Sequence, residues 1–332
     1  MEIKKIFVSK QAGIGDVVLA TPILAGLKNC FPRAHLTLMT FPNAVEAVSG
    51  LPFIDEVLVY DKKKDSAWKV LRAMSGSDLA LLLDLQYRPA LLAWMARVPL
   101  RVGLTHKRRC WLNQPVDWDE SMDHTYEPYV FADILRRGTG IKLSGADLDT
   151  LHFAPAADTE RRQVDAMLAA AGIGPHDVYL ACSPVTAYFL KDWPLDRWQQ
   201  LFTRLWECDG LKTVLFGGPS PAKIENSPGL VDLRGRTNLR QAGYLVEKAG
   251  LLVNSCSLPV HMAAAFRTPA VVLYGFGDPQ RWAPRSHCTV ISAGLPCSPC
   301  DGYRGTQCTD PRCMQKITVD EVYAACKKTL ER

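Results

Sequence analysis

The first strand–turn–helix segment decides the fold: KIFVSKQAGIGDVVLATPIL, residues 5–24. Its apolar run at residues 6–8 predicts a short buried strand, and Leu19, Ile23 and Leu24 have the spacing of one helix face. Two glycines and one acid lie between the strand and the helix. A strand followed by a tight turn and a helix is the building unit of a parallel α/β sheet.

The turn itself contains Gly13, Gly15 and Asp16, and it can be interpreted in two ways. A dinucleotide-binding fingerprint needs a third glycine, but Val18 stands at that position. In the first interpretation the glycines supply backbone freedom and Asp16 caps the helix. In the second, Asp16 performs chemistry at the end of the strand. The rest of the chain has to decide between them.

Length, composition and charge limit the class of protein. With 332 residues the chain is long for one core and sufficient for two domains. The net charge of +5 favours anionic ligands weakly and is too small to indicate nucleic acid. We find no secretory leader and no run of ~18 apolar residues, and therefore expect a cytoplasmic protein. Its eleven cysteines would be reduced there, so a cysteine cluster indicates a metal site or buried thiols.

Strand-like and helix-like segments alternate along the chain, which is typical of parallel βαβ units. The alternation stops at residues 137–159, which are rich in Gly, Ala, Asp and Pro, and then resumes. We therefore expect two Rossmann-like domains, 1–155 and 156–332, whose parallel sheets face each other across a cleft. The expected strands are 5–9, 35–40, 56–60, 79–83 and 101–104, followed by 178–182, 213–216, 251–254 and 270–274.

Loops of the second half contain groups suited to a phosphate. Lys191 lies in the loop SPVTAYFLKDWP, residues 183–194, where its charge can neutralise a phosphate beside the next helix. The stretch NSCSLPVHMAAA, residues 254–265, places Ser257 and His261 at the start of an Ala-rich helix, which suits a pyrophosphate. The alternatives are a solvated lysine and a structural histidine.

Together these motifs resemble glycosyltransferase family 9, the lipopolysaccharide heptosyltransferases, which have the GT-B fold. The resemblance covers most of the chain and depends on several ordered motifs at matching spacing. They are GIGDVVLATPIL at 13–24, KDWP at 191–194, LRGRTNL at 233–239, residues 253–265, LYG at 273–275 and the C-terminal cysteines.

The resemblance implies an inverting transfer of a heptose, or a related sugar, from a nucleotide-diphosphate donor to a glycan hydroxyl, with ADP-heptose as the expected donor. It implies that Asp16, beside Gly13 and Gly15, is the general base toward that hydroxyl. Domain 1–155 would bind the acceptor and domain 156–332 the donor, and the transfer needs no cofactor. The implied donor-binding residues are Thr186, Lys191, Ser257 and His261, and we add Gly217 and Gly218, which form a sharp exit after a strand.

Two positions depart from the family pattern. Its D-S/T-G-x-x-H motif has Cys256 in place of the acid and Leu258 in place of the glycine, while Ser257 and His261 are kept. The lost carboxylate and the added bulk alter the donor pocket or abolish transfer. The alternative functions are a non-catalytic GT-B protein that binds a nucleotide or a glycan, and an epimerase-like enzyme that cleaves a nucleotide sugar without an acceptor.

Four cysteines near the C-terminus follow the pattern C-x2-C-x7-C-x4-C within residues 297–313. Thiolate sets of this kind bind zinc or iron, and some relatives that modify protein carry iron on such a finger. The alternative is four reduced thiols that pack a loop before a helix at 319–330. The cysteines are Cys297, Cys300, Cys308 and Cys313.

A basic cluster lies in the first half, where residues 97–109 contain six basic side chains and no acid. If these side chains face the cleft, they suit an anionic acceptor such as a phosphorylated lipid-linked sugar. That acceptor would bring the protein to the cytoplasmic face of the inner membrane. The alternative is a solvated charged surface. The expected acceptor-binding residues are Arg101, Lys107, Arg108 and Arg109.

Overall fold

The computed structural model describes residues 2–300 and 308–331. The chain divides into two compact units, residues 1–154 and 155–332, called here the N-unit and the C-unit. Each unit contains one six-stranded sheet in which all paired strands are parallel.

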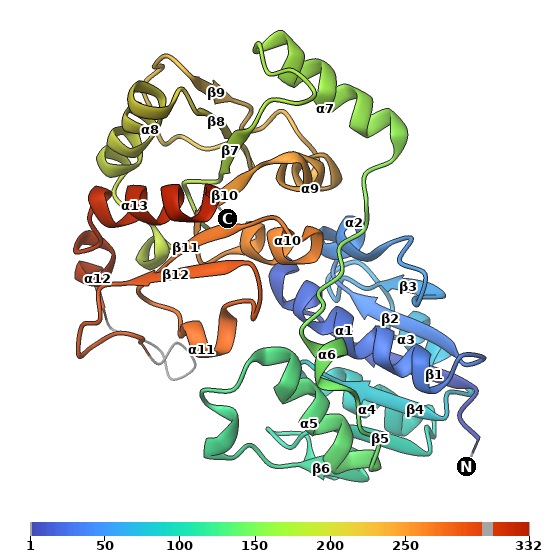
Figure 1. Ribbon diagram of the computed structural model, residues 1–332. Coiled ribbons are helices and arrows are strands. Elements are labelled where there is room, and N and C mark those ends of the chain that lie inside the picture. The colour runs from blue at the N-terminus through green and yellow to red at the C-terminus, as the bar shows by residue number, and fades with distance from the viewer. Residues whose placement is uncertain (1, 301–307, 332) are drawn as a thin grey trace. The chain divides into compact units, whose positions relative to one another are not determined.

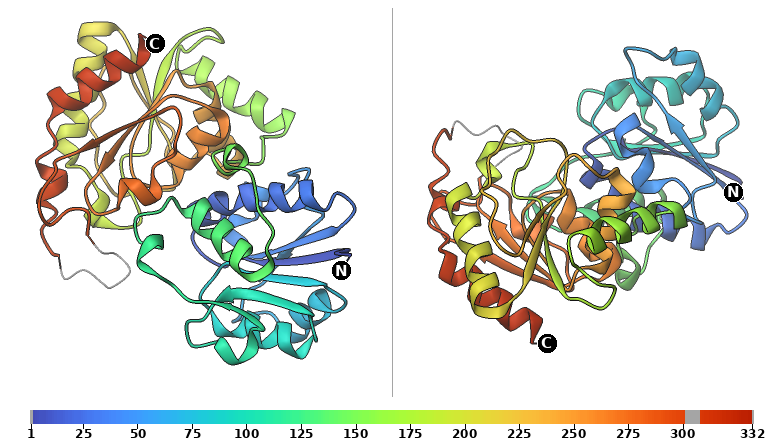
Figure 2. Two further views of the ribbon diagram at one scale, coloured as in Figure 1. Left: turned by 60° about the horizontal axis from the view of Figure 1, so that its bottom comes forward. Right: turned by 90° about the horizontal axis from the view of Figure 1, so that it is seen from above.

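The N-unit sheet has the strand order β3-β2-β1-β4-β5-β6, the doubly wound order of a Rossmann fold. Helices α1 and α5 contact each other, and α3 contacts α4. Figures 1 and 2 show α1 and α5 on one face of the sheet and α3 and α4 on the other. The strands are β1 (Lys5–Ser9), β2 (His35–Thr40), β3 (Glu56–Val59), β4 (Leu79–Leu82), β5 (Leu100–Leu104) and β6 (Gln114–Val116). The helices are α1 (Ile14–Cys30), α2 (Val45–Val48), α3 (Ala67–Met74), α4 (Tyr87–Met95), α5 (Glu127–Thr139) and α6 (Gly145–Leu148).

The C-unit repeats this topology with the order β12-β11-β10-β7-β8-β9. Its strands are β7 (Tyr179–Cys182), β8 (Lys212–Leu215), β9 (Leu230–Asp232), β10 (Leu251–Ser255), β11 (Ala270–Tyr274) and β12 (Cys288–Ser292). Its helices are α7 (Asp158–Ala170), α8 (Leu195–Asp209), α9 (Leu239–Lys248), α10 (Leu258–Phe266), α11 (Pro279–Trp282), α12 (Arg312–Gln315) and α13 (Val319–Leu330).

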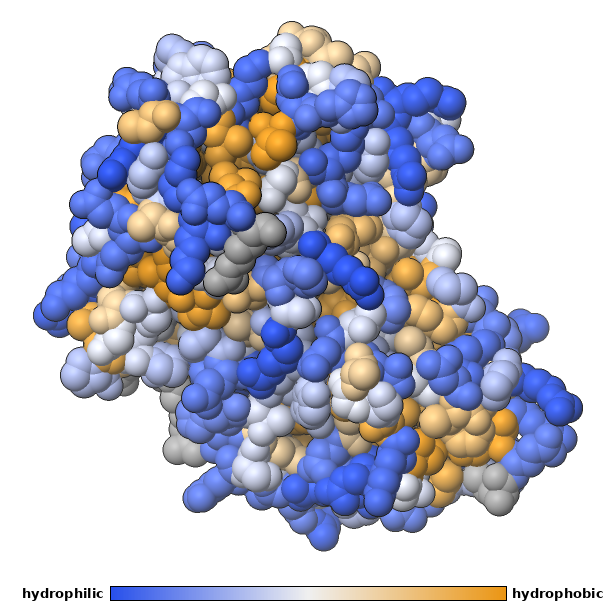
Figure 3. All heavy atoms as spheres, viewed as in Figure 1, coloured by the Kyte–Doolittle hydropathy of each residue, from blue (hydrophilic) through white to orange (hydrophobic). Residues whose placement is uncertain are grey.

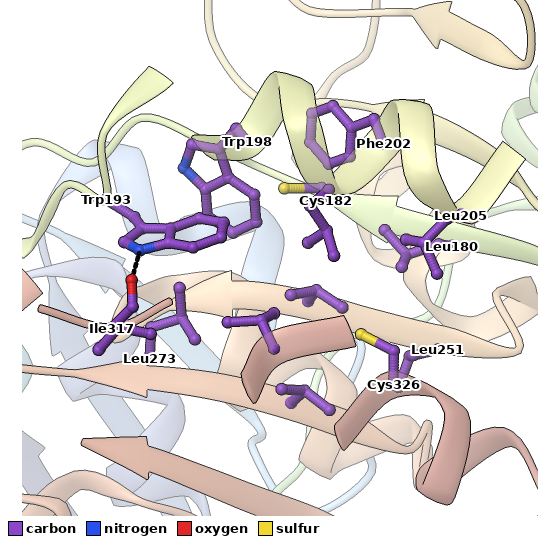
Figure 4. Packing of buried hydrophobic residues seen from close by; sticks show 14 of the residues in the cluster. Leu180, Cys182, Trp193, Trp198, Phe202, Leu205, Leu251, Leu273, Ile317 and Cys326 are labelled. Carbon is purple, nitrogen blue, oxygen red and sulfur yellow. Dashed lines mark hydrogen bonds between the residues drawn. The ribbon is translucent and has the colours of Figure 1, made fainter. Parts of the chain in front are cut away.

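The C-unit core is held by aromatic side chains at one end of α8. Trp198 and Phe202 lie on the buried face of α8 and stack with ring centroids 5.7 Å apart. Trp193, just before this helix, meets Trp198 edge-on at 4.8 Å. Its indole N–H donates to the carbonyl of Ile317 at 3.0 Å, as Figure 4 shows. The segment that leads into α8 is therefore fixed to the core.

All nine expected strands are present, with bounds that differ by one residue or less. Three further strands, β6, β9 and β12, were not expected, and all three lie at sheet edges. On the face drawn in Figure 3 hydrophilic residues cover most of the surface, with hydrophobic residues interspersed. Among the described residues, no helix is long and apolar enough to cross a membrane.

Candidate active site

The strand order of each sheet reverses at one point, between β1 and β4 in the N-unit and between β7 and β10 in the C-unit. In open parallel sheets, ligands bind outside the carboxyl ends of the strands at this switch point. The loop after β1 leads to Asp16, and the loop after β10 leads to Ser257 and His261. The predicted base Asp16 and the predicted donor-binding residues Ser257 and His261 therefore each follow a strand that borders a switch point.

Asp16 is the third residue of α1 and is half-buried. Gly13 is the N-cap, and no side chain caps the helix, so the capping interpretation of Asp16 is wrong. A Cβ atom on Gly13 would lie 3.0 Å from Oδ2 of Asp16, so the glycine leaves room for the carboxylate. Within the described part of the chain Asp16 has no hydrogen-bond or ion-pair partner. No other described side chain therefore occupies its carboxylate.

A second carboxylate, Asp84, lies beyond the end of β4 and is buried. The hydroxyl of Ser9, the last residue of β1, donates to its Oδ2 atom. Nη1 of Arg108 lies 3.4 Å from its Oδ1 atom. Burial raises the pKa of Asp84, although Ser9, Arg108 and Lys10 oppose this shift. The carboxylate connects the ends of β1 and β4 with the loop after β5.

The backbone that leads to Asp16 is tied to neighbouring strand ends. Nζ of Lys10 donates to the carbonyl of Leu83 at 3.3 Å. The side-chain amide of Gln11 donates to the backbone carbonyl of Tyr60 at 3.0 Å. The backbone carbonyl of Gln11 accepts from the side-chain amide of Gln86 at 3.4 Å. The hydrogen bond of Ser9 to Asp84 and these contacts of Lys10 and Gln11 fix the first residues of the loop that leads to Gly13.

Arg108 does not have the predicted role of a direct acceptor-binding group. Its side chain is fully buried. Besides Asp84, its guanidinium donates to the carbonyls of Leu104, Gln86 and Leu82 at 2.8, 3.0 and 3.1 Å. A Cβ atom on Gly103 would lie 3.0 Å from its Nη2 atom, so Gly103 makes room for this packing.

The other predicted acceptor-binding side chains do not gather in one place. Arg101 is the second residue of β5, at the amino end, and donates to the carbonyls of Trp111 and Val98 at 2.8 and 2.6 Å. That strand end is opposite to the switch-point edge, so the prediction for Arg101 is also wrong. Arg109 is exposed and pairs with Asp117 at 3.0 Å, while Lys107 is exposed. Only Lys107 and Arg109 remain candidates.

In the C-unit the switch point is closed by Asn254, which is buried at the end of β10. Its Oδ1 atom accepts from the backbone N–H of Ser183, after β7, at 2.7 Å. Its amide nitrogen donates to the carbonyl of Ser255 at 2.8 Å and to the hydroxyl of Ser257 at 2.9 Å. The amide therefore fixes the loop after β7 against the start of α10.

His261 lies in the first turns of α10 and is only 5% exposed. Its Nδ1 atom has no hydrogen-bond partner among the described residues. Burial lowers the pKa of His261 to about 4, and the positive charge of Lys191 contributes to this shift. Lys191 is thus near His261, and its Nζ atom lies 6.0 Å from the ring centroid of Phe276. A cation and a neutral imidazole share this site.

Thr186 organises the loop that carries Lys191. Its backbone N–H donates to Asp192 at 2.8 Å, and its hydroxyl donates to the carbonyl of Tyr188 at 2.9 Å. Burial raises the pKa of Asp192, and the hydrogen bonds from Thr186 oppose that shift. Sequence reasoning assigned Thr186 to the donor phosphates, whereas in the structure its polar groups are engaged within the loop.

Gly217 and Gly218 follow β8. Gly217 has φ of 119°, a conformation that favours glycine, and a Cβ atom there would come within 2.9 Å of the Ser183 hydroxyl. Gly218 has open space where a Cβ atom would be. Gly217 therefore lets the exit of β8 approach the loop after β7.

The two departures from the family motif lie at the start of α10. Cys256 is 5% exposed, and its N–H donates to the carbonyl of Leu273 at 3.2 Å. Leu258 is the first residue of α10 and is half-buried. On one side of Ser257 the thiol of Cys256 replaces the carboxylate of the family pattern. On the other side the side chain of Leu258 replaces a glycine.

The predicted metal site lies in a cysteine loop that the structure describes only in part, and it stays a prediction. Residues 301–307 of this loop lie outside the described residues, whereas all four cysteines lie inside them. Cys313 is buried in the core, while the thiols of Cys300 and Cys308 donate to the carbonyls of Cys297 and Asp310 at 3.4 and 3.2 Å. In the described part of the chain, no three His, Cys, Asp or Glu side chains are placed to hold a metal ion.

Comparisons with known proteins agree with this architecture. The sequence model of glycosyltransferase family 9 (heptosyltransferase) matches residues 66–308. Lipopolysaccharide heptosyltransferase 3 of Escherichia coli (strain K12) is 26% identical over 296 residues, 81% of this chain and 82% of that protein. A family 9 glycosyl transferase from Veillonella parvula has a crystal structure that matches with a TM-score of 0.82 at 22% identity, covering 100% of this chain and 99% of that one. For E. coli ADP-heptose LPS heptosyltransferase II the TM-score is 0.74 at 21% identity, with 98% of both chains covered.

Two Rossmann-like units, each with a six-stranded parallel sheet, give the chain the GT-B fold of these relatives. The family model covers most of the chain, and the protein belongs to glycosyltransferase family 9. It is an enzyme that transfers a glycosyl group.

Sequence reasoning missed Asp84, Asn254 and Ser9, which position the predicted groups. Asp84 and Asn254 each stand at the carboxyl end of a strand that borders a switch point. A polar residue that ends an apolar strand was therefore the available signal. It could not be used without the strand order, which the sequence pattern does not provide.

Proposed function

We propose that this glycosyltransferase moves a heptose from ADP-heptose to a hydroxyl of a lipopolysaccharide-core acceptor. The names of its relatives, lipopolysaccharide heptosyltransferase 3 and ADP-heptose LPS heptosyltransferase II, support the sugar, the nucleotide and the acceptor class. The observation that carries the proposal is the half-buried, unpartnered carboxylate of Asp16 at the N-unit switch point, considered within the described residues. The protein would act in the cytoplasm.

In the proposed reaction Asp16 accepts the proton of the acceptor hydroxyl. The hydroxyl oxygen forms a bond to the anomeric carbon while the bond from that carbon to the diphosphate oxygen breaks, which inverts the configuration. The nucleoside diphosphate leaves with the electron pair. Lys191, in the C-unit, stabilises the negative charge that develops on it. A single displacement needs neither a covalent intermediate nor a cofactor.

The two units would divide the substrates between them. The C-unit would bind the donor, because Lys191 supplies the cation and the start of α10 supplies Ser257 and the unpaired nitrogen of His261. The N-unit would bind the acceptor, because Asp16 and the exposed cations Lys107 and Arg109 belong to it. An anionic glycolipid is the acceptor class that these charges suit.

Replacement of Asp16 tests the proposal. Asp16→Asn keeps the shape of the side chain and removes its basicity, so we expect turnover to fall by about 10²–10⁴-fold. The measurement is release of ADP from ADP-heptose in the presence of a lipopolysaccharide-core acceptor, with donor affinity followed by calorimetry. Asp158→Asn, at an exposed acid in the first turn of α7, is the matched control. Near-full turnover of Asp16→Asn would contradict the assigned base.

The departures at Cys256 and Leu258 point to an altered donor pocket. Asp at position 256 and Gly at position 258 would restore the family pattern. If the natural residues fit a modified donor sugar, the variant Cys256→Asp/Leu258→Gly loses turnover with that donor. A gain of turnover with ADP-heptose would instead favour a site that has partly lost its activity.

A further inference from the structure

The described residues include eleven large hydrophobic side chains that are exposed, and five of them lie between residues 68 and 95. Trp68 is 74% exposed, and Trp94, Met95 and Tyr87 are each about half exposed. Monomeric soluble proteins rarely concentrate such side chains without a binding role. All five belong to α3, α4 or the loop before α4, on one layer of the N-unit.

Helix α4 has two apolar faces. Ala90, Leu92 and Ala93 are buried and pack in the cluster between this helix and the sheet. On the opposite side, at positions i, i+4, i+7 and i+8, stand Tyr87, Leu91, Trp94 and Met95. The face with Ala90, Leu92 and Ala93 packs on the sheet. The face with Tyr87, Leu91, Trp94 and Met95 points away from the sheet. Tyr87 also meets the ring of Trp111 at 5.9 Å.

Helix α3 continues this surface beside α4, which it contacts. Val70 and Met74 are its buried residues, so Trp68 and Arg72, one turn apart, lie on the opposite side. Figures 1 and 2 show α3 and α4 together on the face of the sheet opposite to α1. We call the exposed and half-buried apolar side chains on this side of both helices the α3–α4 face: Trp68, Tyr87, Leu91, Trp94 and Met95.

The segments that carry this face, and those that flank it in sequence, are rich in exposed positive charge. Eight Lys and Arg side chains between residues 61 and 112 are exposed, whereas the four Asp side chains of that stretch are buried or half-buried. The acids are used by the fold: Asp78 accepts the backbone N–H groups of Lys4 and Lys5, and Asp65 accepts from Asp61 and Lys69. The exposed cations nearest in sequence to α3 are Lys62, Lys63, Lys64, Lys69 and Arg72.

We propose that the α3–α4 face docks on an anionic lipid bilayer. Trp and Tyr side chains settle at the boundary between headgroups and acyl chains, and Lys and Arg extend to anionic headgroups. Exposed aromatic side chains on segments rich in exposed cations match that chemistry. A protein partner whose surface is acidic throughout would not match the apolar side chains of α4.

The proposal for the α3–α4 face does not depend on the proposed donor site. It lies on α3 and α4, whereas the donor-binding groups lie in the C-unit. If ADP-heptose failed to bind, the proposed function would fail while vesicle binding persisted. If vesicle binding failed while donor binding persisted, only the docking surface would be lost.

Co-sedimentation with lipid vesicles tests the surface. We expect the full-length protein to bind vesicles with about 30% phosphatidylglycerol and to bind pure phosphatidylcholine vesicles much more weakly. The variant Lys62→Gln/Lys63→Gln/Lys64→Gln removes three cations. Each cation is expected to raise the partition coefficient onto anionic vesicles about fivefold, so the variant should bind about 100-fold more weakly. The charge-matched control is Arg162→Gln/Lys223→Gln/Lys316→Gln, at exposed C-unit positions, which should bind as the unchanged protein does.

The apolar contribution has its own variant. Trp68→Ser/Trp94→Ser should reduce binding to both kinds of vesicle and remove quenching of tryptophan fluorescence by brominated acyl chains. The control Val178→Ser/Val290→Ser changes exposed apolar side chains of the C-unit and should bind normally. Thermal unfolding checks that all four variants fold, and the exposure of the changed side chains predicts that they do.

Three results would overturn the proposal: no binding to anionic vesicles, equal losses in the variants and in their controls, or a dimer that dissociates when Trp68 and Trp94 are replaced. The last result, measured by size-exclusion chromatography with light scattering, would assign the face to a second copy of the chain.

Discussion

At the scale of single residues, Asp16 depends on the small size of its neighbour. Gly13 has φ of −59° and ψ of 157°, which other residues also adopt, so its backbone does not require glycine. What requires glycine is space, because a Cβ atom on this residue would lie only 3.0 Å from Oδ2 of Asp16. Glycine is therefore needed at position 13 to leave space for the Asp16 carboxylate, and the backbone conformation of the turn does not require it.

Gly13→Ala should therefore reduce turnover more than stability. The added methyl group would push the Asp16 carboxylate aside, and a displacement of about 1 Å in a reacting group can cost about 100-fold in rate. Steady-state kinetics and urea unfolding measure the two effects. Gly145→Ala, where the nearest atom to the new Cβ is 3.5 Å away, is the control. Unchanged turnover would show that Asp16 tolerates the shift.

His261 predicts a specific pH dependence of stability. Its folded-state pKa of about 4 lies below the ordinary value of 6.5, because burial disfavours the charged imidazole. The unfolded chain then binds more protons between these values, so the free energy of unfolding falls as pH falls from about 6.5 to about 4. The expected contribution is about 3 kcal/mol.

Urea unfolding at about pH 7 and about pH 5 can isolate this contribution. His261→Gln should flatten the loss of stability on acidification, because the glutamine does not titrate. His176→Gln, at an exposed histidine, should leave the loss as it is. Identical pH profiles for both variants would mean that His261 is protonated as easily in the folded state as in the unfolded chain.

At the scale of elements, a buried ion pair connects three strand ends of the N-unit. Asp84 follows β4, Arg108 lies beyond β5, and Ser9 ends β1. Solvent does not compete for the guanidinium, because it is fully buried and donates to three carbonyls. The basic cluster of the sequence thus contributes a structural arginine, which a pattern of charges alone does not distinguish from a ligand-binding one.

Removing one partner of this pair should destabilise the N-unit strongly. Asp84→Ala leaves a buried guanidinium without its counter-charge, at an expected cost of about 3–5 kcal/mol in the free energy of unfolding. The double variant Asp84→Leu/Arg108→Met should recover part of that loss, because neither charge remains buried. Asp117→Ala breaks the exposed pair with Arg109 and should have little effect. A double variant no more stable than Asp84→Ala would contradict the role of the pair.

At the scale of the whole molecule, the C-unit has a complete sheet, its own core and all proposed donor-binding residues. Helix α13 packs on α8 and on three strands of the same unit. The elements that position Lys191 and His261 therefore all belong to residues 155–332. Donor binding should not need the N-unit.

We expect ADP-heptose to bind the isolated residues 155–332 with an affinity similar to that of the full chain. Calorimetry measures it, with UDP- and GDP-sugars as alternative donors and residues 1–154 as the negative control. His261→Ala should weaken binding in both the full chain and the isolated unit. Binding by the full chain but not by the folded C-unit would mean that the N-unit supplies donor contacts.

The sequence by itself determined the nine strands with apolar runs, the α/β class and the family, because burial on both faces leaves a continuous apolar signal. It missed β6, β9 and β12, which lie at sheet edges and lack a continuous apolar signal: β6 contains Pro115, β9 is only Leu230–Asp232, and β12 has no buried residue. Asp16, Lys191 and His261 were predicted as site residues from ordered motifs, and their roles stay predictions.

Only the tertiary structure decided which polar residues are free and which are used by the fold. Arg101, Arg108 and Arg109 are equivalent in the sequence, yet one binds backbone carbonyls, one is buried with Asp84 and one is exposed. The four cysteines have metal-binding spacing, yet among the described residues no three such side chains are placed to hold a metal ion. Such differences arise from strand order and long-range contacts, and spacing along the chain does not contain them.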